Sequence, residues 1–96
     1  MTIFLKKFGT LLNSRMSGKE ALAAFQPSLK GVRNDEKVEV DFEGVDVFTP
    51  SWGDEFLSPL FERFGDRLTL KNTENLSVQA SLKMLEKVHS KNFSYA

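Results

Sequence analysis

The chain has 96 residues, 41% of them hydrophobic, and a formal net charge of zero from 13 basic and 13 acidic side chains. This length fits one domain and leaves no room for a second, and the lack of cysteine excludes disulfides and thiolate metal sites. No segment approaches the ~20 apolar residues that span a bilayer, and the apolar start is too short for a secretory signal. We therefore expect a cytoplasmic protein without a membrane partner.

The charges are unevenly distributed along the chain. Residues 1–33 carry six basic and one acidic side chain, residues 34–66 two basic and ten acidic, and residues 67–96 five basic and two acidic. Phosphate backbones need a basic surface, so the acidic middle argues against a nucleic-acid partner. It favours a basic protein partner or, less strongly, a divalent cation.

The first third of the chain predicts a strand followed by a helix. Thr2–Leu5 is a short apolar run that suits an edge strand. Ser17 and Glu20 have the spacing of a capping box, and apolar residues from Ala21 to Leu29 then recur on one helical stripe. Pro27 falls late in this helix, where we expect it to kink or end the helix.

The middle third predicts a strand, a short extended piece and a second helix. Lys37–Phe42 alternates polar and apolar residues, which is the period of a strand, and Val45–Phe48 is a second extended piece. Pro50 forces the residue before it out of the helical region, and Ser51 is a suitable N-cap. Pro59 removes one hydrogen bond inside this helix, so we expect a kink or restart there.

The last third predicts another strand and another helix. Arg67–Lys71 alternates as a strand, the apolar positions from Leu76 onward mark an amphipathic helix to about Asn92, and residues 93–96 are expected to form a loose tail. Strands that alternate with helices imply right-handed crossovers. The fold class is therefore α/β, with a small mixed or mostly parallel sheet and about three helices.

The most informative segment is the turn and helix start at Thr49–Glu55. The free N–H groups of a helix start favour an anion, and Asp54 and Glu55 lie in the first turn, where the helix dipole favours negative charge. Trp52 is either an exposed interface anchor beside these acids or folds back onto Pro50 or the sheet. This arrangement suits a docking surface that phosphorylation controls.

Three runs in this part of the chain resemble a known family. Val40–Val45 (Val-Asp-Phe-Glu-Gly-Val), Phe48–Ser51 and Asp54–Leu57 are similar to the STAS-like domains of unknown function. These domains are distant relatives of anti-sigma factor antagonists and of the cytoplasmic domains of sulfate transporters. The resemblance extends over residues 8–90 and implies that residues 1–96 form a single STAS-like domain.

In anti-sigma factor antagonists the corresponding helix starts with Asp-Ser-Ser-Gly. The second serine is phosphorylated by an ATPase-fold kinase, which binds the unmodified form and releases the phosphorylated one. Alignment on Gly53 places Ser51 at the first serine, Trp52 at the phosphorylated one and Pro50 at the aspartate. Ser51 and Thr49 are the only hydroxyls near enough to substitute, and Ser51 is the better candidate phosphoacceptor.

The resemblance implies a non-catalytic regulatory module that docks a protein partner, a histidine-kinase-like ATPase. The expected partner-binding residues are Pro50, Ser51, Trp52, Asp54 and Glu55. No enzyme activity, cofactor or metal site is expected.

Two alternatives remain open at this point. Asp41 and Asp46, with Asp54, would form a phosphoryl receiver or Mg²⁺-dependent enzyme if the three carboxylates converge. The helix start at Ser51 would alternatively bind a nucleotide or another anion, although Gly-rich phosphate motifs are absent. His89 is expected to be solvated near the end of the last helix, and Arg15 to form a surface salt bridge or to bind an anion.

Overall fold

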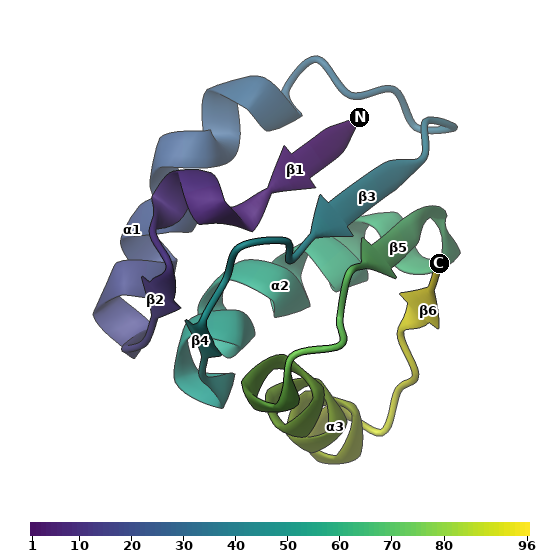
Figure 1. Cartoon of the computed structure of the whole chain (residues 1–96). Coiled ribbons are helices and arrows are strands. Elements are labelled where there is room, and N and C mark those ends of the chain that lie inside the picture. Colours follow the sequence, from purple (N-terminus) through teal and green to yellow (C-terminus); the bar gives the residue numbers. More distant parts are fainter.

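The computed structural model describes all residues, 1–96, as three α-helices and two parallel sheets (Figure 1). The α-helices are α1 (Arg15–Leu29), α2 (Pro50–Phe64) and α3 (Leu76–His89). The strands are β1 (Thr2–Phe4), β2 (Leu11–Leu12), β3 (Val38–Asp41), β4 (Val47–Phe48), β5 (Leu68–Lys71) and β6 (Ser94–Tyr95). Short 3₁₀ turns occupy Leu5–Phe8 and Gly65–Arg67. No helix has the length and apolar character needed to cross a membrane.

The main sheet has the strand order β1-β3-β5-β6, and every neighbouring pair is parallel. Ile3 is in register with Val40, which is in register with Leu70, and all three are buried. In Figure 1, α1 and α2 lie behind this sheet and α3 lies below it. The prediction of an α/β fold with a mostly parallel sheet and about three helices is confirmed.

A second, two-stranded parallel sheet joins β2 to β4. Backbone bonds from Asp46 and Val47 to Thr10, and from Thr49 to Leu12, extend this pairing on both sides. The small sheet therefore ties the chain before α1 to the chain before α2, and it brings the first turns of the two helices together.

Helices α1 and α2 approach each other closely at Gly18. A Cβ atom at this position would lie 2.5 Å from the backbone oxygen of Trp52. Phe25 on α1 and Phe56 on α2 pack with ring centroids 6.2 Å apart, and both belong to a core of 21 buried apolar residues. The close approach therefore depends on the missing side chain at Gly18.

The predicted N-cap of α1 is wrong, because the helix begins three residues earlier. Ser14 is the cap, and its hydroxyl accepts a hydrogen bond of 3.1 Å from the backbone N–H of Ser17. Ser17 is thus the donor of the capping bond instead of its acceptor. The apolar stripe that starts at Ala21 fixes the buried face of α1 but not its first turn.

The two prolines inside helices do not interrupt them. Pro27 lies within α1, which ends two residues later as the sequence allowed, and Pro59 lies within α2, which continues to Phe64. Helix α2 therefore continues through Pro59 without a restart. Phe56 and Leu60, on either side of Pro59, are buried, and their burial offsets the one lost hydrogen bond.

The expectation of a loose tail at residues 93–96 is wrong, because the segment after α3 pairs with the sheet. Ser94 and Tyr95 form β6 beside β5, and Glu86 of α3 holds this segment from the side. The Glu86 carboxylate accepts hydrogen bonds from the Phe93 N–H at 2.9 Å and from the Tyr95 hydroxyl at 3.2 Å. Partial burial, followed by the charge of Glu86, raises the pKa of Tyr95 to about 12.

Gly18→Ala is expected to lower the free energy of unfolding by about 1–3 kcal/mol, because the new methyl group forces α1 and α2 apart. Gly31→Ala is the matched control, since no atom lies within 4 Å of a Cβ at that position; it should leave stability unchanged or raise it by up to about 1 kcal/mol. Urea denaturation of both variants measures the difference. Equal stabilities would contradict the close approach.

Glu86→Gln is expected to lower the pKa of Tyr95 from about 12 towards its ordinary value of 10.0, because the neighbouring negative charge is lost. Tyr95 is the only tyrosine in the chain, so ultraviolet absorbance of the phenolate reports it alone. Glu74→Gln, an exposed acid on the loop before α3, serves as the control. A Tyr95 pKa that does not respond to Glu86→Gln would show that β6 is not held by this carboxylate.

Candidate functional site

The start of α2 is capped by Thr49 and not by Ser51, which corrects the sequence prediction. Thr49 is extended, and its hydroxyl accepts a hydrogen bond of 3.4 Å from the backbone N–H of Trp52. Pro50 explains the difference: it keeps Thr49 out of the helical region, which is the conformation of an N-cap, and its own fixed φ suits the first helical position. Ser51 is therefore the second residue of the helix, with its hydroxyl free of the cap. The prediction that Asp54 and Glu55 lie in the first turn is wrong for the same reason, because the helix starts at Pro50 and its first turn holds no acid.

Trp52 is fully buried, so its predicted role as an exposed anchor for a partner is wrong. Its ring stacks on Phe56 with centroids 4.9 Å apart and meets Phe48 at 6.0 Å and Phe8 at 6.1 Å. The sequence left open whether this residue folds inward, and an aromatic cluster contributed by distant segments decides it. The indole N–H has no hydrogen-bond partner, so its position is set by packing alone.

With Trp52 turned inward, the next polar residues of α2 point outward. Ser51 and Asp54 line a groove together with Pro50 and with Arg15 from the start of α1. Its other wall belongs to α3, where Met84 is 54% and Val88 69% exposed. Three of the residues expected to meet a partner, Pro50, Ser51 and Asp54, thus share a groove with exposed apolar side chains of α3 that no sequence motif marked.

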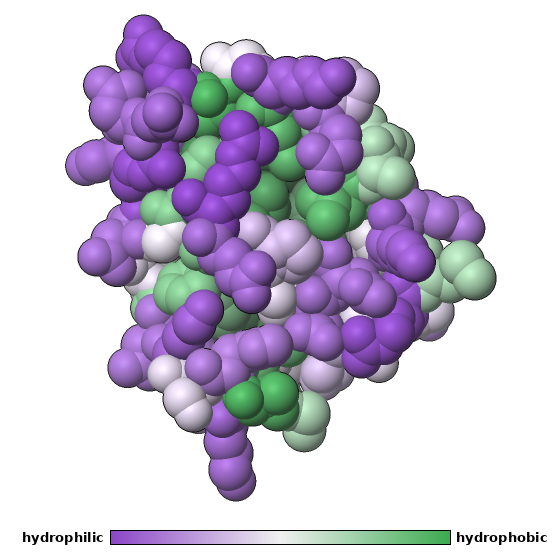
Figure 2. Space-filling model, turned by 180° about the vertical axis from the view of Figure 1, so that it is seen from behind, coloured by the Kyte–Doolittle hydropathy of each residue, from purple (hydrophilic) through white to green (hydrophobic).

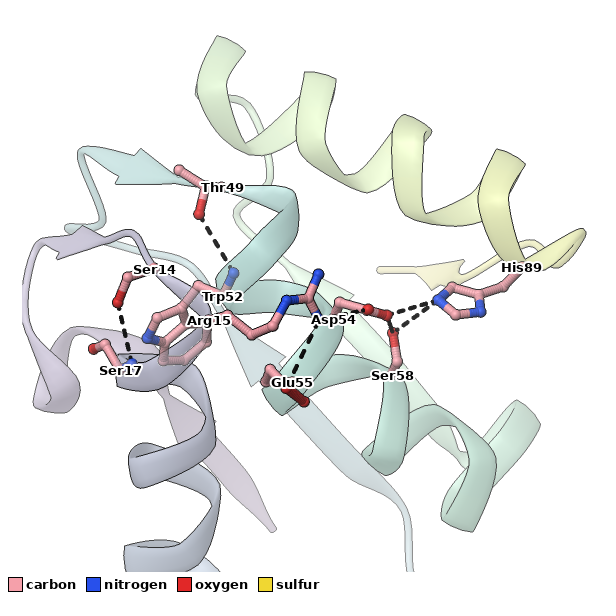
Figure 3. A network of polar contacts seen from close by, with 9 residues as sticks. All are labelled: Ser14, Arg15, Ser17, Thr49, Trp52, Asp54, Glu55, Ser58 and His89. Atoms are coloured by element: carbon pink, nitrogen blue, oxygen red, sulfur yellow. Dashed lines mark hydrogen bonds and ion pairs between the residues drawn. The ribbon is translucent and has the colours of Figure 1, made fainter.

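Asp54 is the centre of a polar cluster that joins all three helices (Figure 3). One carboxylate oxygen accepts a bond of 3.0 Å from the Arg15 guanidinium, which also lies 3.7 Å from Glu55. The other oxygen lies 2.8 Å from His89 Nε2 and accepts a 3.2 Å bond from the Ser58 hydroxyl. Arg15, followed by His89, lowers the pKa of Asp54 below its ordinary value.

The cluster settles the expectations for Arg15 and His89. Arg15 forms the surface salt bridge that the sequence offered as one of two roles. His89 is not simply solvated at the end of α3, because its ring contacts Asp54. No local sequence pattern predicts this contact, since the two residues are 35 positions apart and no periodicity links them.

Ser58, His89 and Asp54 do not form a catalytic triad, although all three are in contact. A triad needs the carboxylate on Nδ1 of the imidazole and the hydroxyl on Nε2. Here both the Ser58 hydroxyl, at 3.4 Å, and the Asp54 carboxylate, at 2.8 Å, approach Nε2. The arrangement therefore links helices and does not activate a nucleophile.

The carboxylates of the receiver hypothesis do not converge. Asp41 is buried at the end of β3 and accepts bonds from the Asn72 amide at 2.8 Å and the Glu43 N–H at 2.9 Å. Burial opposes its ionisation, but these bonds outweigh it, so the pKa of Asp41 is lowered. No group of three or more metal-ligating side chains gathers around Asp41, Asp46 or Asp54. The convergence that the receiver alternative requires is therefore not met.

Comparison with known proteins gives one result. A family model described as a STAS-like domain of unknown function (DUF4325) matches residues 24–78. The matched segment runs from the second half of α1 to the first turn of α3 and includes Thr49–Glu55. No curated protein and no solved structure matches the chain.

Asp54→Asn is expected to lower the urea midpoint at pH 7. The pKa of Asp54 in the folded protein lies below its ordinary value of 3.8. The Asp54 carboxylate therefore contributes to the free energy of unfolding at pH values above 3.8, and this contribution is lost as the pH falls through the pKa that Asp54 has in the folded protein. The difference from the wild type should therefore shrink below that pH. Asp35→Asn, at an acid whose side chain is 85% exposed, should change the midpoint at neither pH. A deficit for Asp54→Asn that is equal at pH 7 and in acid would contradict the charge pairing.

Proposed function

Because the chain belongs to the family of STAS-like domains of unknown function, we propose that it is a non-catalytic regulatory module that docks a protein partner beside the start of α2. We call this area the docking surface. It consists of Arg15, Pro50, Ser51, Asp54, Glu55, Met84 and Val88. Trp52 belongs to it only indirectly, as the buried residue that orients the helix.

The observation that carries the proposal is the groove between the first turns of α2 and the outer side of α3. One wall is polar, with Ser51, Asp54 and Arg15, and the other is apolar, with Met84 and Val88 exposed. Protein interfaces combine an apolar centre with a polar rim in this way. Exposed apolar side chains beside such a rim mark a place where another protein gains contact area.

Ser51 is the position at which phosphorylation would control docking. The hydroxyl of Thr49 is occupied as the helix cap and also donates to the Leu12 carbonyl at 3.4 Å. A phosphate on Ser51 adds about −1.5 to −2 charges at pH 7, three and four residues before Asp54 and Glu55 on the same helix face. It would also compete with these carboxylates for Arg15, and so would change both the charge and the shape of the groove.

A histidine-kinase-like ATPase is the partner class that the family resemblance supports. Anti-sigma factor antagonists use the corresponding helix start for such a partner, and this chain presents polar and apolar contacts at the same place. Only part of the acidic middle third belongs to the surface: Asp54 and Glu55 do, whereas Glu43 and Asp46 lie on the β3–β4 loop and outside the groove.

Ser51→Asp is expected to weaken binding of a histidine-kinase-like ATPase, isolated with the wild-type protein as bait, by at least about tenfold, or about 1.4 kcal/mol. An acid in the first helical turn does not destabilise the helix, so lost binding would not reflect unfolding. Isothermal calorimetry measures the affinity, with Ser51→Ala expected to bind normally.

Ser28→Asp is the matched control, because Ser28 is an exposed serine at the far end of α1. It should bind the ATPase like the wild type. The proposal is overturned if Ser51→Asp binds as tightly as Ser28→Asp, or if no ATPase of this class binds the wild-type protein.

A further inference from the structure

Helix α3 carries a second apolar stripe in addition to the one that faces the core. Val78, Leu82 and Leu85 are buried on the inner side. On the outer side Leu76, Ala80, Met84 and Val88 follow one another at intervals of four residues. We call these four residues the outer stripe. Leu76 is 80%, Met84 54% and Val88 69% exposed, so no other part of the chain covers the outer stripe.

The outer stripe runs the whole length of the helix. From Leu76 to Val88 it extends about 18 Å along the helix axis at about 1.5 Å per residue. Figure 2 shows a hydrophobic area bordered by hydrophilic atoms at the lower edge of the molecule, where α3 lies. Rows of side chains four residues apart are the ridges by which two helices commonly pack against each other. The stripe therefore has the form of one half of a helix–helix contact.

We propose that the outer stripe packs against the same stripe of a second copy of this chain, with the two α3 helices parallel about a two-fold axis. The formal net charge of zero means that two copies do not repel each other as whole molecules. A symmetric contact needs a surface that is complementary to itself, and the charges beside the stripe meet this requirement.

Opposite charges lie on the two sides of the stripe. Lys83 lies on the side towards Tyr95 beside Glu86, and Lys87 follows Lys83 one turn later, so this side carries more basic than acidic groups. Asp54 lies across the groove on the other side with Glu55, and Arg15 pairs with both carboxylates, so this side carries more acidic than basic groups. When the two-fold axis is parallel to α3, the lysine side of one stripe lies against the carboxylate side of the other. The lysines of each copy then face the carboxylates of the second copy. Antiparallel helices would instead place lysines against lysines, which is why the parallel arrangement is favoured.

The dimer itself goes beyond the proposed function and does not rest on it; only its effect on partner binding does. Met84 and Val88 belong both to the outer stripe and to the docking surface. A second copy and a protein partner would therefore compete for the same side of α3. Self-association would thus hold the docking surface covered until a partner displaces the second copy.

Sedimentation equilibrium of the full chain tests the proposal without any partner, so its outcome is independent of ATPase binding. The contact is small, so we expect monomers at about 1 µM and dimers at about 1 mM. Met84→Glu should remain monomeric throughout, because it places a charge in the centre of the stripe. Met16→Glu is the matched control: Met16 is 68% exposed on α1, and this variant should dimerise like the wild type.

The wild type staying monomeric at about 1 mM, or Met84→Glu dimerising like Met16→Glu, would overturn the proposal. Cysteine substitutions then test the orientation, since the chain has no cysteine of its own. Leu76→Cys and Val88→Cys should each form a disulfide with its own kind under oxidation if the helices are parallel. Disulfides that form only when the two variants are mixed would show antiparallel helices and overturn the proposed arrangement.

Discussion

The burial of Trp52 is the constraint on which the rest of the structure depends. Its ring is held among Phe8, Phe48 and Phe56, which come from three separate segments. It fits there because Gly18 lets α1 approach its backbone. Once Trp52 and Phe56 face inward, the helical period turns Ser51, Asp54 and Ser58 outward. The outward position of the candidate site residues on α2 is therefore a consequence of core packing.

The polar cluster around Asp54 completes this arrangement by linking the three helices at one carboxylate. Arg15, Ser58 and His89 all bond to it, so the first turn of α1 and the last turn of α3 are fixed relative to α2. Partly exposed ion pairs of this kind add little stability individually, and of these contacts the one between His89 and Asp54 joins α3 to α2. The same geometry does not match a catalytic triad, because the Ser58 hydroxyl and the Asp54 carboxylate both contact Nε2 of His89.

The sequence predicted the fold more fully than the site, and the reason is physical. Alternation in Lys37–Phe42 and Arg67–Lys71 and the apolar stripes of the helices report burial, which determines β3, β5 and the helix layer. The STAS-like resemblance is also confirmed. Helix starts depend on single hydrogen bonds, which the sequence pattern does not report. The sequence therefore placed the N-cap of α1 at Ser17 instead of Ser14, and the N-cap of α2 at Ser51 instead of Thr49. Contacts between distant segments, such as those of Trp52, His89 and β6, have no local pattern and could not be predicted.

The position of Trp52 can be measured directly, because it is the only tryptophan in the chain. Its fluorescence should show the short emission wavelength of an apolar environment and resist quenching by acrylamide in the folded protein, whereas urea should make it accessible. This result would support an α2 helix rotated so that Ser51 and Asp54 face outward. A native protein with long-wavelength emission that acrylamide quenches as readily as in urea would contradict the account, since an exposed Trp52 would turn the helix and remove the docking surface.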